Sequence, residues 1–254
     1  MSSPLNTPDF EGPAFYARPR LLQHRRLRDW WTLLHPPYTL CHLSFVVIGA
    51  TLAGTLNTFR LLMTLLAFFL AVGVGAHALD ELKGRPLATS IPEYQLVAAA
   101  VLGVGGAVAL GVVGSFEVSA YLAVFVVVGI VIALAYNLEL AGGRLHNDLT
   151  FVLGWGGLPV LTGFFAQHGT LNVTAFAAAI FAVLVSATQR QLSSPARELR
   201  RRVNYVEGTI TRLDGTSETI DKATLLAPLE RSLRALCLAS ITVAVTLVLA
   251  RAAI

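Results

Sequence analysis

The chain has 254 residues, of which 55% are hydrophobic and only 13% are charged, with a mean hydropathy of +0.66. A water-soluble domain of this length carries far more charge, so the composition excludes a soluble globular protein and indicates that lipid solvates most of the chain. The formal net charge of +4 is small and gives no reason to expect a nucleic-acid partner.

The N-terminal part of the chain divides into two segments before the first apolar run. Residues 1–20 are rich in Pro and Ser, which predicts a flexible segment. Residues 21–35 place Leu and Trp on one helical face with arginines beside it, a pattern that predicts an amphipathic helix lying in the membrane interface. Residues 36–254 are then expected to form a transmembrane helical domain.

Long apolar runs fill this domain, and each has about the 17–25 residues that a helix needs to cross a hydrocarbon core. Backbone polar groups in lipid must be paired within the segment, so runs of this length predict helices, whereas a barrel would show short alternating strands. The expected fold is an all-α, polytopic transmembrane bundle of about seven spans. The expected spans are residues 37–57, 60–80, 94–114, 117–137, 149–167, 171–190 and 233–253.

Two spans contain glycine patterns. The third carries LGVGGAVALGVVG, which predicts close packing of neighbouring helices. The fifth carries LGWGGLP, in which three glycines and Pro159 predict a distorted helix beside a cavity, because irregular backbone at membrane depth is tolerated only against protein or water. Cys41 and Cys237 fall inside predicted spans and are interpreted as small core residues.

Positive charge is distributed unevenly between the two sets of loops. All but two of the 19 Lys and Arg residues, Arg60 and Arg251, fall in segments on one side of the predicted membrane. By the positive-inside rule this side is cytoplasmic, so we expect a multi-pass protein of the cell (inner) membrane with its N-terminus inside. The longest cytoplasmic loop, 191–232, has Asp214-Gly215 between β-prone runs, which predicts a small hairpin.

Polar residues gather at the cytoplasmic ends of the second, fourth and sixth spans. His77 and Glu81 are spaced i to i+4 and share a helical face, and the group around them is denser than a membrane boundary needs. A basic residue such as Arg144 is also what positive-inside bias alone would place there. A face of this kind is suited to an anionic headgroup or a diphosphate. The candidate site residues are His77, Asp80, Glu81, Lys83, Arg85, Tyr136, Asn137, Arg144, Gln189 and Arg190.

Clusters in these positions, with Arg85-Pro86-Leu87 after the first, resemble the UbiA superfamily of intramembrane prenyltransferases over about residues 20–200. The resemblance implies a cytoplasm-facing intramembrane cavity in which an isoprenoid diphosphate is ionised and its prenyl group captured by an acceptor. It implies that Asp80 and Glu81 hold Mg²⁺ and act in catalysis together with Arg85. The residues that would bind the substrate are His77, Lys83, Tyr136, Asn137, Arg144, Gln189 and Arg190.

The sequence also departs from the family pattern. Ala76 and Gly84 stand where the first motif has Asn and Asp, Gln189 to Glu198 contains no aspartate, and the family has nine spans. A catalytically silent UbiA-like lipid-binding or scaffold protein is therefore a second hypothesis. A third is a small-solute or ion transporter that uses His77 and Asp80 as a proton relay. The chain length of the donor, the acceptor and the oligomeric state stay open.

Overall fold

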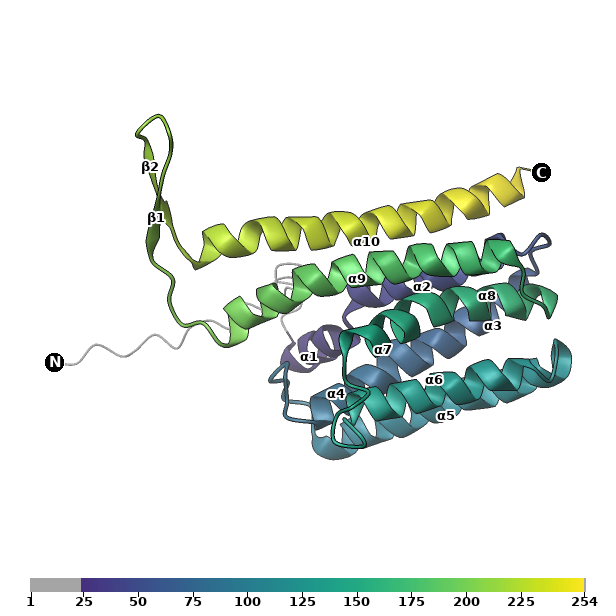
Figure 1. The fold of residues 1–254 in the computed structure, drawn as a ribbon. Helices are drawn as coiled ribbons and strands as arrows, with labels where there is room; N and C mark the ends of the chain where they lie inside the picture. The colour runs from purple at the N-terminus through teal and green to yellow at the C-terminus, as the bar shows by residue number, and fades with distance from the viewer. Residues whose placement is uncertain (1–23, 254) are drawn as a thin grey trace.

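The computed structural model describes residues 24–253. The predicted flexible segment 1–20 and the first residues of the predicted interfacial helix lie outside this range. The described chain is a bundle of long helices that run side by side, with one small hairpin at its edge (Figure 1). The elements in chain order are α1 (Arg25–Leu34), α2 (Pro36–Thr51), α3 (Thr58–Phe68), η1 (Phe69–Ala76), α4 (His77–Leu82), α5 (Glu93–Glu117), α6 (Leu122–Asn137), α7 (Asp148–Val152), η2 (Leu153–Gly157), α8 (Leu158–His168), α9 (Val173–Arg201), β1 (Gly208–Thr211), β2 (Ser217–Ile220) and α10 (Lys222–Ala252).

Within residues 24–253, six helical stretches are long and apolar enough to cross a membrane, which identifies a multi-pass membrane protein. The fourth expected span is present as α6, but it is only 16 residues long. At 1.5 Å per residue it extends about 24 Å, which is less than the thickness of a typical hydrocarbon core. The six stretches are Arg25–Thr51, Thr58–Leu82, Glu93–Glu117, Asp148–His168, Val173–Arg201 and Lys222–Ala252.

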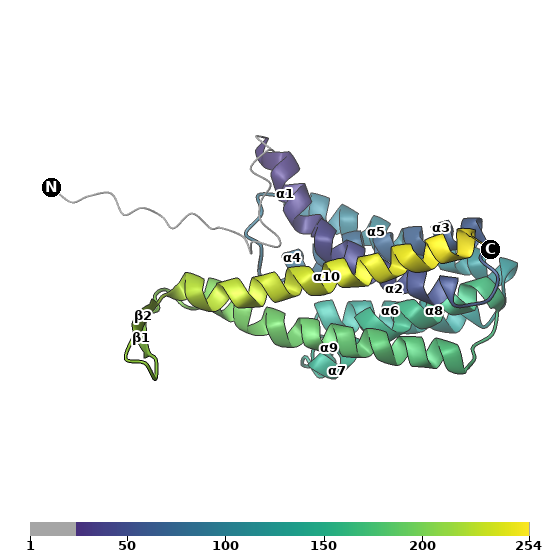
Figure 2. The same cartoon turned by 90° about the horizontal axis from the view of Figure 1, so that it is seen from above.

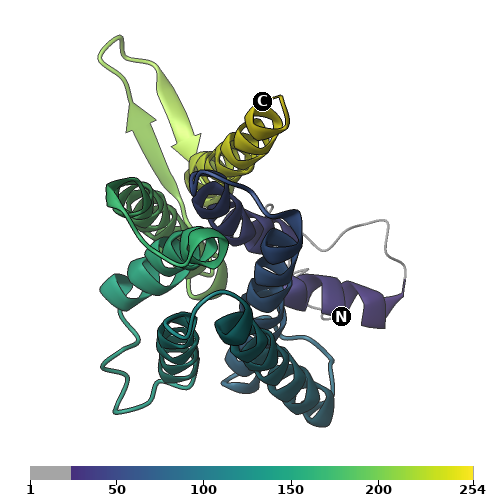
Figure 3. The ribbon, with the colours of Figure 1, turned by 90° about the vertical axis from the view of Figure 1, so that its right-hand side faces the viewer.

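Helix α1 is amphipathic, as predicted, and it is also docked on the protein. Leu33 and Asp29 are buried, while Leu27 and Trp31 are exposed. The Asp29 carboxylate accepts hydrogen bonds from the backbone and hydroxyl of Ser90, in the loop between α4 and α5. The view along the bundle in Figure 3 shows α1, in purple, projecting sideways from it. Its location at a membrane interface stays a prediction.

Glycines allow helices to touch backbone to backbone at the centre of the bundle. A Cβ on Gly49 of α2 would lie 2.1 Å from the carbonyl oxygen of Val160 in α8. On α5, a Cβ on Gly103 would lie 2.7 Å from the amide nitrogen of Gly75 in η1. The close packing predicted for the third span is therefore confirmed at Gly103. Cys41 and Cys237 are free and buried, as expected of core residues.

Two spans contain a π-helical segment, η1 and η2. The second coincides with the glycine-rich sequence of the fifth span, so the predicted distortion is confirmed. Gly154 and Trp155 of η2 line a cavity, which confirms the other half of that prediction. Residues of η1, Ala71 and Val72, line the same cavity. Because π-helical segments are frequent at functional sites, this cavity is a candidate binding site.

The expected hairpin is also confirmed. β1 pairs antiparallel with β2, and Gly215 takes a positive φ of 85° in the turn between them. Figures 1 and 2 show that α9 and α10 extend past the other helices and that the hairpin projects beyond them, at the end of the bundle where α1 and α4 also lie. We refer to this as the polar end, comprising the loops 83–92 and 138–147 and the adjoining ends of α4, α6, α7 and α9.

Candidate functional site

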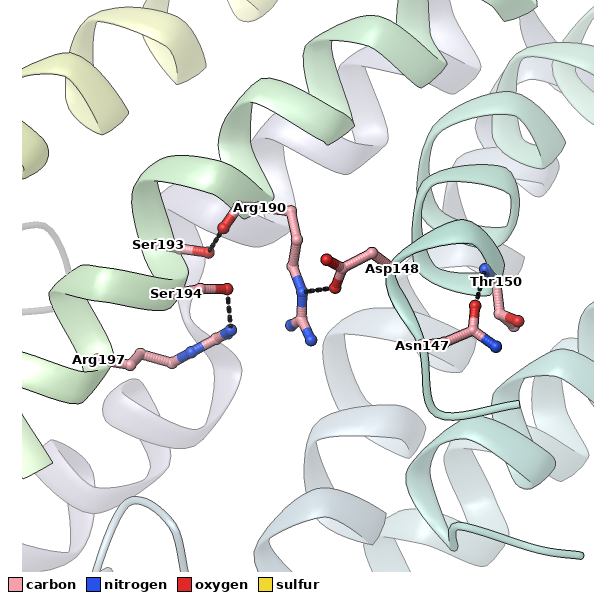
Figure 4. Close-up of polar contacts among 7 residues, drawn as sticks. All are labelled: Asn147, Asp148, Thr150, Arg190, Ser193, Ser194 and Arg197. Carbon is pink, nitrogen blue, oxygen red and sulfur yellow. Dashed lines mark hydrogen bonds and ion pairs between the residues drawn. The ribbon is translucent and has the colours of Figure 1, made fainter. Parts of the chain in front are cut away.

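An arginine–aspartate pair marks the polar end between α9 and α7. Arg190 Nε lies 2.7 Å from Asp148 Oδ1, and the Arg190 guanidinium lies 5.2 Å from the centroid of the Phe151 ring. Arg197, two turns further along α9, donates a hydrogen bond of 3.2 Å to Ser194 Oγ. Figure 4 shows both arginines leaving α9 on the side that faces Asp148. Two guanidinium groups therefore lie on the side of α9 that faces the Asp148 carboxylate.

The helix start at Asn147 explains why Asp148 is available to Arg190. The Asn147 side chain accepts a hydrogen bond of 2.9 Å from the amide of Thr150 and so caps α7. Asp148 itself occupies the first helical position of α7. Its side chain is 76% exposed and reaches toward α9.

Tyr136, at the end of α6, connects this pair to the rest of the polar end. Its ring stacks on His146 with centroids 4.3 Å apart, and the His146 Nδ1 lies 2.9 Å from the Tyr136 carbonyl oxygen. The charges of Arg190, Arg197 and Asp80 all act on the Tyr136 hydroxyl. Tyr136 is only 6% exposed, so its side chain is buried.

Asp80 approaches the same region from α4. The charges acting on it include those of Arg201, Arg197 and His146. The ends of α4 and α9 and the loop before α7 therefore lie within electrostatic range of one another around Asp80 and Tyr136. Of the residues predicted from sequence, Asp80, Tyr136 and Arg190 are brought together in this way.

Other predicted residues lie at the rim of the polar end. Lys83 Nζ is 2.7 Å from Glu139 Oε2 and 3.0 Å from the carbonyl oxygen of Leu138. The hydrogen bond from Lys83 lowers the pKa of the Glu139 carboxyl below its usual value. Arg144 is exposed on the loop 138–147, next to Gly142 and Gly143, which both take positive φ.

Glu81 and Arg85 hold the loop 83–92 in place. Glu81 is fully buried, and its two carboxylate oxygens accept hydrogen bonds from the amides of Leu87 and Thr89 and from the Thr89 hydroxyl, at 2.8–2.9 Å. Arg85 donates a bond of 2.6 Å to the carbonyl oxygen of Ile91. These contacts give both side chains a structural role. The catalytic and metal-binding roles predicted for them stay predictions.

The remaining candidates face the interior. Asn137 is buried and donates a bond of 2.7 Å to the Ala133 carbonyl. The His77 Nδ1 lies 3.1 Å from the Gly73 carbonyl oxygen, and its ring packs edge to face on His35. Gln189, which directly precedes Arg190 in α9, is also buried. Sequence inspection missed Tyr38 and His42, which follow the predicted interfacial helix, because neither belongs to a charged cluster.

A cavity of about 400 Å³ lies between α3, α5, α6 and α8. Its walls are mostly apolar, and the charged residues that line it, Arg60 and Glu117, stand at the end of the bundle away from the polar end. Trp155 of η2 forms part of the wall. The same side chain stacks on Phe151 at 5.3 Å and contacts Tyr136 at 4.8 Å, so it stands between the cavity and the polar end.

The magnesium implied by the family resemblance fits these residues poorly. Both Glu81 oxygens already accept hydrogen bonds from protein donors, and the charges of Arg197 and Arg201 act on Asp80. Over residues 24–253, no group of three or more His, Cys, Asp and Glu side chains is arranged to hold a metal ion. Hard cations bind through several oxygens at once, so this donor set suits an anion better. No protein-family model, curated protein or solved structure matches the chain.

Proposed function

We propose that this chain is a UbiA-like integral membrane prenyltransferase that binds an isoprenoid diphosphate at the polar end and transfers its prenyl group. The observation that carries the proposal is that Arg190, Arg197 and Asp80 lie within electrostatic range of Tyr136, next to an apolar cavity behind Trp155. A ligand that matches both parts has a multiply charged head and a long apolar chain.

The charges at the polar end favour recognition of the diphosphate by guanidinium groups. Arginine presents planar pairs of donors that bind phosphate oxygens bidentately, and such bonds are roughly twice as strong as neutral ones. Arg190 is 84% buried, which reduces solvent screening of its charge. The exposed Arg144 at the rim adds positive charge on the route by which the anion enters, whereas the charge of Lys83 is balanced by Glu139.

The same arrangement supports transfer chemistry. When the bond between prenyl C1 and the diphosphate oxygen breaks, negative charge grows on the leaving group, and fixed guanidinium donors stabilise that charge. The allylic cation that forms is attracted by aromatic faces, which the stacked Phe151 and Trp155 supply next to Arg190. The apolar walls beyond Trp155 keep water away from the cation.

Binding of geranylgeranyl diphosphate to the purified protein, measured by microscale thermophoresis, tests the first step. We expect binding in the presence of EDTA and at least a tenfold weaker affinity for Arg190→Ala. Arg212→Ala, in the hairpin, is the matched control and should bind like the parent. Failure of the parent to bind, or equal affinity of the two variants, contradicts the proposal. If binding requires added Mg²⁺, the result contradicts recognition by guanidinium groups alone and supports the predicted metal site at Asp80 and Glu81.

A second candidate is a catalytically silent relative that binds an isoprenoid lipid without transferring it. The fully bonded carboxylate of Glu81 favours this candidate, because it removes one of two predicted metal ligands. Product formation from radiolabelled geranylgeranyl diphosphate separates the two. Turnover that falls in Asp80→Asn supports the enzyme. Tight binding with no product from any isoprenoid diphosphate supports the silent protein.

A further inference from the structure

A single residue, His35, separates α1 from α2, the apolar part of the first membrane-length stretch. His35 takes a left-handed backbone conformation, with φ 43° and ψ 57°, and Pro36 and Pro37 then begin α2. The chain therefore changes direction at His35, and Figures 2 and 3 show α1 leaving the line of the bundle at the polar end. Because so short a link joins it to a span, α1 stays within reach of the membrane surface.

The two sides of α1 have different surroundings. Successive residues of an α-helix are rotated by about 100°, so residues two positions apart lie on nearly opposite sides. Asp29 and Leu33 share one face, and both are buried against the protein. Leu27 and Trp31, each two positions earlier, lie on the other side, where they are 56% and 44% exposed. The helix therefore has one face on the protein and an apolar face that residues 24–253 leave uncovered.

Positive charge borders this apolar face. Three of the ten residues of α1 are arginines: Arg25, Arg26 and Arg28. Arg26 and Arg28 directly precede and follow Leu27, so they flank it on both sides. Within the part of the chain that the structure describes, no carboxylate forms an ion pair with any of the three. An apolar stripe with a tryptophan, beside unbalanced arginines, is complementary to a leaflet that contains anionic phospholipid.

The buried face of α1 ties the helix to the loop 83–92. An Asp29 carboxylate oxygen accepts a hydrogen bond of 3.0 Å from the Ser90 amide and a second bond from the Ser90 hydroxyl. Leu33 belongs to the same core cluster as Ile91, the next residue of that loop. A helix that is held on the leaflet therefore also holds the loop 83–92 at the polar end.

We propose that α1 binds the anionic phospholipids of the leaflet on its side of the membrane and that this contact orders the loop 83–92 through Asp29. Leu27 and Trp31 insert between the lipids at headgroup depth, and the arginines beside them bind lipid phosphates. Added salt weakens the attraction because it screens these exposed charges. The inference concerns a surface outside the diphosphate site and does not depend on prenyl transfer.

Brominated lipids quench tryptophan fluorescence on contact, so they report which lipid touches Trp31. The full chain is placed in nanodiscs of equal parts phosphatidylcholine and phosphatidylglycerol, with bromine near the headgroup end of the acyl chains of only one of the two lipids. We expect at least twofold stronger quenching by brominated phosphatidylglycerol, and we expect Trp31→Phe to remove most of this difference. Equal quenching by the two lipids overturns the preference for anionic lipid. Identical quenching of the parent and Trp31→Phe overturns the docking of α1 on the membrane.

Two double variants assign the preference to the arginines of α1. Arg25→Gln/Arg26→Gln removes two exposed charges from the helix and should be quenched equally by the two lipids. Arg202→Gln/Arg212→Gln, which removes two exposed charges near the hairpin, is the matched control and should keep the preference of the parent. A preference that survives Arg25→Gln/Arg26→Gln contradicts recognition by these side chains.

Hydrogen–deuterium exchange tests the connection between α1 and the loop. In the parent, peptides from the loop 83–92 should exchange at least threefold more slowly in nanodiscs that contain phosphatidylglycerol than in phosphatidylcholine alone. Asp29→Ala removes the acceptor of both Ser90 bonds and should abolish this difference, whereas Asp29→Asn, which keeps one acceptor oxygen, should retain it in reduced form. Quenching of Trp31 in the same variants shows that α1 is still in place. Equal exchange of the parent in the two lipids, or a difference that persists in Asp29→Ala, overturns the connection.

Discussion

Glu81 is a residue type typical of metal sites, but in this structure its carboxylate accepts hydrogen bonds from backbone amides instead. In the sequence it lies beside Asp80, near His77 and Lys83, and nothing in that spacing distinguishes a ligand from a loop anchor. The distinction depends on Leu87 and Thr89, whose amides return to the carboxylate six and eight residues later. The chain turns back toward Glu81 because Gly84 and Arg85 both take positive φ. The spacing of residues in the sequence does not predict this turn.

Replacing Glu81 by Ala should therefore lower the stability of the folded protein, whether or not a ligand is present. Three donor groups lose their acceptor, two of them buried in Thr89, and a buried group left unpaired costs about 1–3 kcal/mol. We expect a clear fall in the thermal unfolding midpoint of the protein in detergent. Glu139→Gln, which removes an exposed partner of Lys83, serves as the control and should change it little. An unchanged midpoint for Glu81→Ala would show that the loop 83–92 does not depend on this carboxylate.

At the scale of the element, glycine position determines how closely two helices approach. The pattern LGVGGAVALGVVG predicts close packing of α5 but does not say which glycine is at the contact. The structure places Gly103 against the backbone of η1, whereas a Cβ on Gly105, two residues later, would meet nothing within 4 Å. Which face of α5 packs on η1 depends on the neighbouring helices. The periodicity of the α5 sequence therefore does not predict which glycine makes the contact.

Gly103→Ala should destabilise the bundle, and Gly105→Ala should not. The atoms that a Cβ at position 103 would meet belong to the backbone of Gly75 and Leu70, which cannot rotate aside as a side chain does. Overpacking of this kind costs about 1–3 kcal/mol. At position 105 alanine points into open space and improves helix propensity. Thermal unfolding of both variants in the same detergent measures the difference, and similar midpoints would refute the close contact.

Over the whole molecule, the sequence predicts helix number and position better than it predicts the site. Apolar runs, helix breakers and the Asp214-Gly215 turn are local signals. The spans, the distorted fifth helix and the hairpin could therefore be predicted from the sequence. The site joins segments that are distant along the chain. Arg190 meets Asp148 across 42 residues, and His42 meets Trp155 across 113. Contacts of that separation follow from the packing of the bundle, which no motif in the chain encodes.

The orientation of the bundle is the prediction that all site arguments share, because a cytoplasmic donor reaches the polar end only if that end faces the cytoplasm. Among the described residues 24–253, the Lys and Arg residues other than Arg60 and Arg251 belong to the elements and loops on the side of α1, α4 and the hairpin. Single cysteines placed on the two sides test it. Thr55→Cys, in the exposed turn before α3, and Thr216→Cys, at the hairpin tip, are each accessible to solvent.

A membrane-impermeant maleimide should label Thr55→Cys in intact cells and Thr216→Cys only after lysis. The native thiols of Cys41 and Cys237 are buried, so the parent protein should give little background and is the matched control. The reverse pattern would place the arginines of the polar end outside the cell. A soluble cytoplasmic isoprenoid diphosphate could not then reach them, and the ligand would have to be a lipid phosphate already present in the outer leaflet.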